Sequence, residues 1–309
     1  MDGEKIGRDE FLQLPAEQVR RWVLQKNKPH TGIFVADGNR RLVMTQTGLT
    51  TASKDFYPAY LEIVTGFFMK NLAVFFDHGL NTLLFPLFGT SLLDRCDSYR
   101  QVVMPGLIRL LFQNEKWLCF YRENAVRVKT YGNMEILNRE FPGLGLADIV
   151  RQTEIQTSSN EKHTLFYGFF SSVIPGIALI REAHRLMESQ NRELTQAEWT
   201  RLYYGEPAAP ADFFITSTCI GYLGALPPWG YGKNTQVYTL PVPGILGLNE
   251  RTYRDILYDL LFLRQTSPAD KMDGIEAKDI EYLKNFYREN RDRVVGTGKK
   301  VGKCWLPNT

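Results

Sequence analysis

Short strand-like runs alternate with long helix-like runs along this chain, and this alternation limits the folds available to it. The six strand-like runs cover residues 32–36, 81–88, 126–131, 163–170, 212–216 and 236–240, and the first two are apolar. Helix-like segments separate most of them. Strands joined by helical crossovers pair in parallel, and the helices cover both faces of the sheet. The sequence therefore predicts an α/β protein, a single domain with a central, mostly parallel six-stranded sheet flanked by helices.

The helix-like segments are expected near residues 8–28, 55–78, 99–123, 145–155, 173–189, 195–204, 249–264 and 277–292. No strong linker divides the chain, and 309 residues are ample for one large core. We therefore expect an N-terminal helical extension over residues 1–29, the main domain over 30–295 and a flexible tail over 296–309.

The balance of charge narrows the class of ligand. A net charge of +3 and a pI of about 8.5 suit an anionic small molecule but fall short of a nucleic-acid-binding surface. Four cysteines lie far apart without a CxxC pair, so free thiols in a reducing compartment are expected. The N-terminus lacks the apolar segment of a signal peptide. We expect a cytoplasmic protein that does not bind nucleic acid.

The first strand-like run ends abruptly in Asp37-Gly38-Asn39-Arg40-Arg41. Ligands of parallel sheets bind beyond the carboxyl ends of strands. Glycine lets the backbone approach an anion closely, and arginine offers a planar fork that matches phosphate oxygens. The alternative is a surface turn, because Asp-Gly-Asn is ordinary turn chemistry. The preceding buried-type strand and the arginine pair favour a phosphate-binding corner.

A carboxylate in that corner needs a further explanation. Asp37 would repel phosphate on its own, so its presence makes sense mainly if a divalent cation lies between the two groups. The four histidines show no metal-ligand spacing. Asp37 with a divalent cation is thus the predicted metal site.

Aromatic residues make up 13% of the chain. They indicate either a large aromatic core or an apolar cavity able to hold a hydrocarbon chain and face a carbocation. The candidate cavity walls, each of which could equally be core, are Phe67, Phe68, Phe85, Phe88, Phe169, Phe170, Tyr222 and Trp229.

The strand followed by Asp37-Gly38-Asn39-Arg40-Arg41 resembles the opening D-G-N-x-R motif of the cis-prenyltransferase family, and the order of elements fits over about residues 30–265. The resemblance implies a cis-prenyltransferase-like catalytic domain and a homodimer. It implies that Asp37 holds Mg²⁺ and assists departure of diphosphate, while Gly38, Asn39, Arg40 and Arg41 cradle the phosphates of a prenyl diphosphate. The double arginine is similar to the branch that makes irregular, lavandulyl-type products.

Other family motifs are missing. The stretch that binds a second, homoallylic diphosphate in the family carries two arginines, and Thr216 and Tyr222 stand at their positions. The S-x-E-N-W segment is absent, with Arg95 nearby as a substitute diphosphate ligand. Thr51 and Asp55 occupy the region of another lost arginine and histidine. The chain therefore keeps one phosphate site and discards the other.

Three hypotheses follow. In the first, the chain is a Mg²⁺-dependent terpene synthase that ionises one prenyl diphosphate within an apolar pocket. In the second, it is a prenyltransferase that condenses two prenyl diphosphates, with charge supplied by Lys233, Arg95 or Arg251. In the third, it is a non-catalytic partner subunit, although such partners typically lose the D-G-N-x-R motif that this chain keeps.

The apolar helix near 55–78 suits a tunnel wall or, alternatively, a peripheral contact with a membrane.

Overall fold

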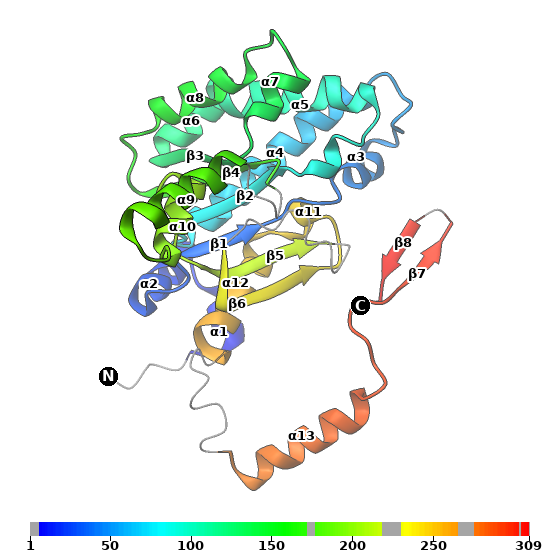
Figure 1. The fold of residues 1–309 in the computed structure, drawn as a ribbon. Helices are drawn as coiled ribbons and strands as arrows, with labels where there is room; N and C mark the ends of the chain where they lie inside the picture. Colours follow the sequence, from blue (N-terminus) through cyan, green and yellow to red (C-terminus); the bar gives the residue numbers. More distant parts are fainter. Residues whose placement is uncertain (1–5, 172–176, 218–229, 265–274, 303, 309) are drawn as a thin grey trace.

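The structure, a computed structural model, describes residues 6–171, 177–217, 230–264, 275–302 and 304–308. A six-stranded sheet forms its centre, in the order β3-β4-β2-β1-β5-β6, and every neighbouring pair of strands is parallel (Figure 1). All six carboxyl ends therefore lie at one edge, as predicted. The strands are β1 (Thr31–Phe34), β2 (Thr82–Phe88), β3 (Val126–Gly132), β4 (His163–Phe169), β5 (Ala211–Ser217) and β6 (Tyr231–Leu240).

Helices cover the two faces of this sheet (Figure 1). The α-helices of the described residues are α1 (Arg8–Gln13), α2 (Ala16–Lys26), α3 (Asn39–Thr47), α4 (Phe56–Asp77), α5 (Asp97–Phe112), α6 (Glu115–Glu123), α7 (Glu135–Glu140), α8 (Leu146–Gln156), α9 (Ile177–Gln190), α10 (Gln196–Tyr204), α11 (Gly244–Gly247), α12 (Glu250–Tyr258) and α13 (Ala277–Asn290), of which α13 does not cover the sheet. A 3₁₀ turn (Thr90–Leu92) follows β2, and a π-helical turn (Asp259–Leu263) extends α12.

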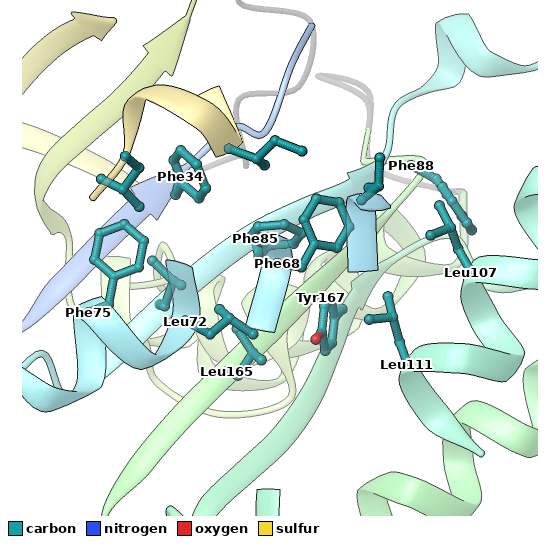
Figure 2. Close-up of a cluster of buried hydrophobic side chains, with 14 of the residues drawn as sticks. Phe34, Phe68, Leu72, Phe75, Phe85, Phe88, Leu107, Leu111, Leu165 and Tyr167 are labelled. Carbon is teal, nitrogen blue, oxygen red and sulfur yellow. The ribbon is translucent and has the colours of Figure 1, made fainter. Parts of the chain in front are cut away.

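Helix α4 is the centre of the larger hydrophobic core. Its buried side chains recur every three or four residues, so they share one face that packs on the sheet. In Figure 2, Phe68 of α4 lies beside Phe85 of β2, and their ring centroids are 4.9 Å apart. Burying each such side chain contributes about 1.5–3 kcal/mol. By length and mean hydropathy α4 could span a membrane, but here this buried stripe makes it the core helix of an α/β domain.

A smaller core lies on the opposite face of the sheet. Tyr204 of α10 packs there with Ile33 of β1 and Phe166 of β4. Alternate residues of β1 thus serve different cores, because Phe34 belongs to the larger one. Both faces of β1 are covered, which explains why its residues read as a continuous apolar run.

Several element boundaries differ from the sequence-based expectation. The helix expected near 8–28 is two helices, because Pro15 follows α1 and begins a new helical segment. The helix expected near 99–123 is interrupted at Asn114, whose side chain accepts a hydrogen bond from the Lys116 amide and caps α6. Helices α7 and α11 were not expected.

The C-terminal segment contains regular structure that the sequence did not predict. Residues 296–309 contain an antiparallel hairpin of β7 (Gly298–Val301) and β8 (Cys304–Pro307). Figure 1 shows this hairpin and α13 apart from the sheet domain. Lysines and glycines made the segment look like a loose tail, and its cross-strand pairing left little pattern in the sequence.

Candidate active site

The loop after β1 has a fixed conformation that depends on Gly38. Its φ of 84° is left-handed, and a Cβ atom there would lie 3.1 Å from Pro243. The backbone of the loop is tied to neighbouring segments: the carbonyl of Asp37 accepts hydrogen bonds from the Gly244 amide at 3.1 Å and the Ser217 hydroxyl at 3.3 Å. These contacts hold the start of α3 at the carboxyl edge of the sheet.

The carboxylate of Asp37 faces outward from this loop. Its Oδ1 accepts a hydrogen bond from the Gly38 amide at 2.6 Å, and the side chain is exposed. Among the described residues, no group of three or more acidic, histidine or cysteine side chains is arranged to hold a metal. A single exposed carboxylate still fits Mg²⁺, which is commonly held by one or two carboxylates together with substrate phosphates and water.

Asn39 is fixed within the first turn of α3. Its Nδ2 donates a hydrogen bond to the carbonyl of Ala36 at 2.9 Å. Its Oδ1 is buried without a hydrogen-bond partner. The Asn39 side chain also lies near the buried Tyr60 hydroxyl and lowers its pKa, against the larger effect of burial.

A surface pocket of about 490 Å³ opens beside α3. It contains two arginines, Arg40 from the start of α3 and Arg95 from the segment before α5. These segments follow β1 and β2, which are neighbours in the sheet. The lining residues are Arg40, Thr51, Ala52, Tyr57, Asp94, Arg95, Cys96 and Tyr99. Two guanidinium groups in one pocket are suited to bind a multiply charged phosphate group.

A pair of tyrosines supports the pocket from beneath. The hydroxyls of Tyr60 and Tyr99 lie 3.4 Å apart, and Arg40 lies over the Tyr99 ring. Burial raises the pKa of both tyrosines above the usual value near 10, although the nearby Arg40 charge opposes the shift. Both hydroxyls are therefore protonated at neutral pH and can donate hydrogen bonds.

The structure brings together only part of the predicted diphosphate set. Arg40 and Arg95 line the same pocket, whereas Asp37, Gly38, Asn39 and Arg41 form the adjoining loop and helix start without lining it. Asp94 also lines the pocket, beside Arg95. Tyr57, Tyr99 and Cys96 were not singled out. Cys96 and Tyr99 follow the end of β2, so their segment was expected at the carboxyl edge, whereas Tyr57 lies in the first turn of α4, before β2. Strand order alone does not indicate which side chains of these segments reach the pocket.

The phenylalanines expected as cavity walls lie mainly in the hydrophobic core. None of them lines the pocket beside Arg40. Phe88 contacts Phe169 with ring centroids 5.6 Å apart, and Phe67 is partly buried against the core. Figure 2 shows Phe68, Phe85 and Phe88 packed along β2 and α4. The buried members of the set are Phe68, Phe85, Phe88, Phe169 and Phe170. Tyr222 and Trp229 lie outside the described residues.

The end of β5 offers no arginine to a second phosphate group. Thr216 is buried, and the Ser217 hydroxyl is used by the Asp37 carbonyl. Tyr222, which stands where the cis-prenyltransferase motif has its second arginine, lies outside the described residues. The two arginines of the pocket, by contrast, come from the segments after β1 and β2.

No protein-family model matches the chain. The fold is that of the cis-prenyltransferases. Lavandulyl diphosphate synthase from Lavandula x intermedia aligns with a TM-score of 0.62 and 13% identity, covering 77% of this chain and 97% of that one. A probable undecaprenyl diphosphate synthase from Campylobacter jejuni aligns with a TM-score of 0.55 and 16% identity, covering 77% and 96%.

Two relatives match by sequence over almost the whole chain. Tuberculosinyl adenosine transferase from Mycobacterium tuberculosis is 30% identical over 97% of this chain and 98% of its own length. (+)-Kolavelool synthase from Herpetosiphon aurantiacus is 24% identical over 97% and 95%. The chain belongs to the cis-prenyltransferase-like family and is a prenyl diphosphate-utilising enzyme. The hypothesis of a non-catalytic partner subunit is therefore set aside.

Proposed function

We propose that the chain is a terpene synthase that binds one prenyl diphosphate with the help of Mg²⁺, ionises it and converts the resulting allylic cation to a terpene. The observation that carries this proposal is the meeting of Arg40 and Arg95 in one pocket at the end of β1. Thr216 in place of an arginine at the end of β5 supports a single diphosphate site.

The arginines supply the binding and part of the catalysis. Each charge-assisted hydrogen bond to a phosphate contributes on the order of 1.5–3 kcal/mol. As the carbon–oxygen bond breaks, negative charge grows on the departing diphosphate, so Arg40 and Arg95 stabilise the transition state more than the ground state. The Tyr99 ring keeps the Arg40 guanidinium at the pocket.

Asp37 is the residue that would hold Mg²⁺. Its exposed carboxylate and its place one helical turn before Arg40 fit a cation shared between protein and diphosphate. When bound, Mg²⁺ would neutralise phosphate charge as a Lewis acid. Asp94 is a second candidate carboxylate, because it lines the pocket beside Arg95.

The relatives' names favour a second candidate, transfer of the prenyl group to a non-prenyl acceptor. One relative is named for transfer to adenosine and the other for synthesis of a terpene alcohol. Both fates can follow the same ionisation, with a nucleoside or water as the nucleophile. Condensation of two prenyl diphosphates is disfavoured, because the lost arginines would weaken a second diphosphate site about a hundredfold or more.

A product assay separates these fates. Purified protein and Mg²⁺ would be incubated with geranyl, farnesyl or geranylgeranyl diphosphate alone, then with adenosine or isopentenyl diphosphate added. A terpene from one substrate alone supports the synthase. Product only with adenosine supports the transferase, and product only with isopentenyl diphosphate, as a longer chain, refutes both. A homodimer belongs to the same proposal and rests on the resemblance, while a cytoplasmic location rests on the widely spaced cysteines.

A further inference from the structure

A second, smaller pocket lies at the opposite edge of the sheet. Its volume is about 110 Å³, and it is bordered by α2, by the segment before β1, and by the starts of β2 and β4. Its lining residues are Arg20, Val23, Leu24, Asn27, Lys28, Pro29, His30, Gly79, Asn81, Lys162 and His163. Residues that precede β1, β2 and β4 therefore meet here, whereas segments that follow β1 and β2 meet at the active site.

This pocket is lined by positive charge without a compensating carboxylate. Arg20, Lys28 and Lys162 reach it from three different segments, and no aspartate or glutamate lines it. In the part of the chain that the structure describes, none of these three side chains forms an ion pair with a carboxylate. Three cations around so small a volume repel one another, and a bound anion would relieve that repulsion.

His163 forms the buried side of the pocket and has a defined tautomer. Only 4% of the residue is exposed, and its ring stacks on Phe76 with centroids 4.5 Å apart. Its Nδ1 lies 2.8 Å from the Leu80 carbonyl, which can only accept, so Nδ1 carries the hydrogen. Burial, aided by the charges of Lys162 and Arg20, lowers the pKa of His163 to about 4. At neutral pH its Nε2 is therefore a hydrogen-bond acceptor.

Gly79 brings two walls of the pocket together. Its φ of 94° is left-handed, and a Cβ atom there would lie 3.2 Å from both Arg20 Cγ and Val23 Cγ1. Only glycine allows the end of α4 to approach α2 this closely without strain. The stem of Arg20 is thereby held at the mouth of the pocket.

We propose that this pocket binds hydrogen phosphate, as the free ion or as the terminal group of a diphosphate. The arginine and lysines would donate to the charged phosphate oxygens, and the phosphate hydroxyl would donate to Nε2 of His163. Sulfate has a similar size but carries no hydroxyl at neutral pH, so it leaves the Nε2 acceptor unsatisfied. The positive charge of the pocket would thus attract the anion, and the Nε2 acceptor would favour an anion that carries a hydroxyl.

The two anion sites are separate and independent. Lys28 to His30 precede β1 and Asp37 follows it, so the sites lie at opposite ends of the same strand. Residues 30 and 37 span at most roughly 23 Å of extended chain. The second site does not require the proposed terpene synthase activity.

Isothermal titration with inorganic phosphate tests the inference. We would use the full-length Arg40→Ala/Arg95→Ala variant, in which the active-site arginines cannot contribute, and compare phosphate with sulfate at equal ionic strength and neutral pH. We expect one phosphate per chain and at least about tenfold weaker sulfate binding, which corresponds to one lost hydrogen bond of about 1.4 kcal/mol.

Variants assign the binding to this pocket. Adding Lys162→Ala should weaken phosphate binding about tenfold, whereas Lys116→Ala, which removes an equal charge outside the pocket, should not. His163→Asn keeps a donor for Leu80 but removes the Nε2 acceptor, so phosphate should fall to the level of sulfate. If that variant does not fold, Lys28→Ala replaces it, with the same loss of phosphate affinity expected as for Lys162→Ala.

Three results would overturn the proposal: no saturable phosphate binding, equal affinity for sulfate, or unchanged phosphate affinity in Lys162→Ala. Equal titration by diphosphate and phosphate would indicate recognition of a terminal phosphate group.

Discussion

The guanidinium carbon of Arg40 lies 5.7 Å from the centre of the Tyr99 ring. Arg40 belongs to the first turn of α3 and Tyr99 to the first turn of α5, so this contact joins the segments that follow β1 and β2. A cation over an aromatic face gains about 0.5–2 kcal/mol. The contact fixes one wall of the pocket that Arg95 completes.

Both arginines should matter for substrate turnover. We expect Arg40→Ala and Arg95→Ala each to lower kcat/KM for a prenyl diphosphate by about 10- to 150-fold, the effect of losing about 1.5–3 kcal/mol of phosphate contact. Steady-state kinetics measure this. Arg151→Ala removes an exposed arginine of α8 and should leave kcat/KM unchanged. Wild-type activity in Arg95→Ala would exclude Arg95 from the site.

The ring of Tyr99, rather than its hydroxyl, should govern substrate binding. Tyr99→Leu removes the face under Arg40 and should raise KM severalfold, in line with a loss of about 1 kcal/mol. Tyr99→Phe keeps the ring and should keep KM near the wild-type value. Equal increases in KM for both variants would show that the hydroxyl, and not the cation–π contact, acts in binding.

Asp37→Asn tests the metal assignment. The amide is nearly isosteric but uncharged, so Mg²⁺ binding with substrate should weaken, and kcat should fall about a hundredfold or more because several kcal/mol of charge stabilisation are lost. A titration of activity against Mg²⁺ should shift to higher concentration in the variant. Asp292→Asn, at an exposed carboxylate in the turn after α13, is the matched control. An unchanged Mg²⁺ titration in Asp37→Asn would remove Asp37 as the ligand.

The folded protein should lose stability in mild acid. Burial lowers the pKa of His78 and of His163, the latter to about 4. Unfolding frees both to bind protons near pH 6.5, so the unfolded state binds more protons below that pH and stability falls as pH decreases. Thermal unfolding should show a lower Tm at pH 5 than at pH 7.5. His163→Asn should show a smaller decrease, and an unchanged pH dependence would contradict this assignment.

The contacts of His78 explain how its protonation would destabilise the folded protein. Its Nε2 accepts a hydrogen bond from Nε of the buried Arg254 at 3.0 Å, and its Nδ1 lies 2.8 Å from the Val74 carbonyl. A proton on Nε2 would end the first contact and place two positive charges together. The same arginine donates to the Leu12 carbonyl at 3.0 Å, so α1, α4 and α12 share this network.

Most of the sheet could be predicted from the sequence because its strands are short runs rich in β-branched and aromatic residues, separated by helix-like segments. Helix boundaries were harder. Pro15 is a recognisable signal for the boundary between α1 and α2. Asn114, which caps α6, is a weaker signal because it lies within an otherwise helical pattern. The terminal hairpin was missed because Lys299 and Lys300 face solvent on a strand that belongs to no core.

The candidate site was predictable in part for a similar reason. Strand order places the residues after β1 and β2 together, so Arg40 and Arg95 could be paired from topology. Tyr99 and Asp94 could not, because their places depend on how α5 packs and turns against α4. The core phenylalanines could not be told from cavity walls, since both environments favour the same side chains.

A crystal structure with an unreactive prenyl thiolodiphosphate would show where the diphosphate binds. We expect the diphosphate between Arg40 and Arg95, a cation at Asp37 and one prenyl ligand per chain. A diphosphate bound at the end of β5 instead, or an empty pocket beside Arg40, would contradict this expectation.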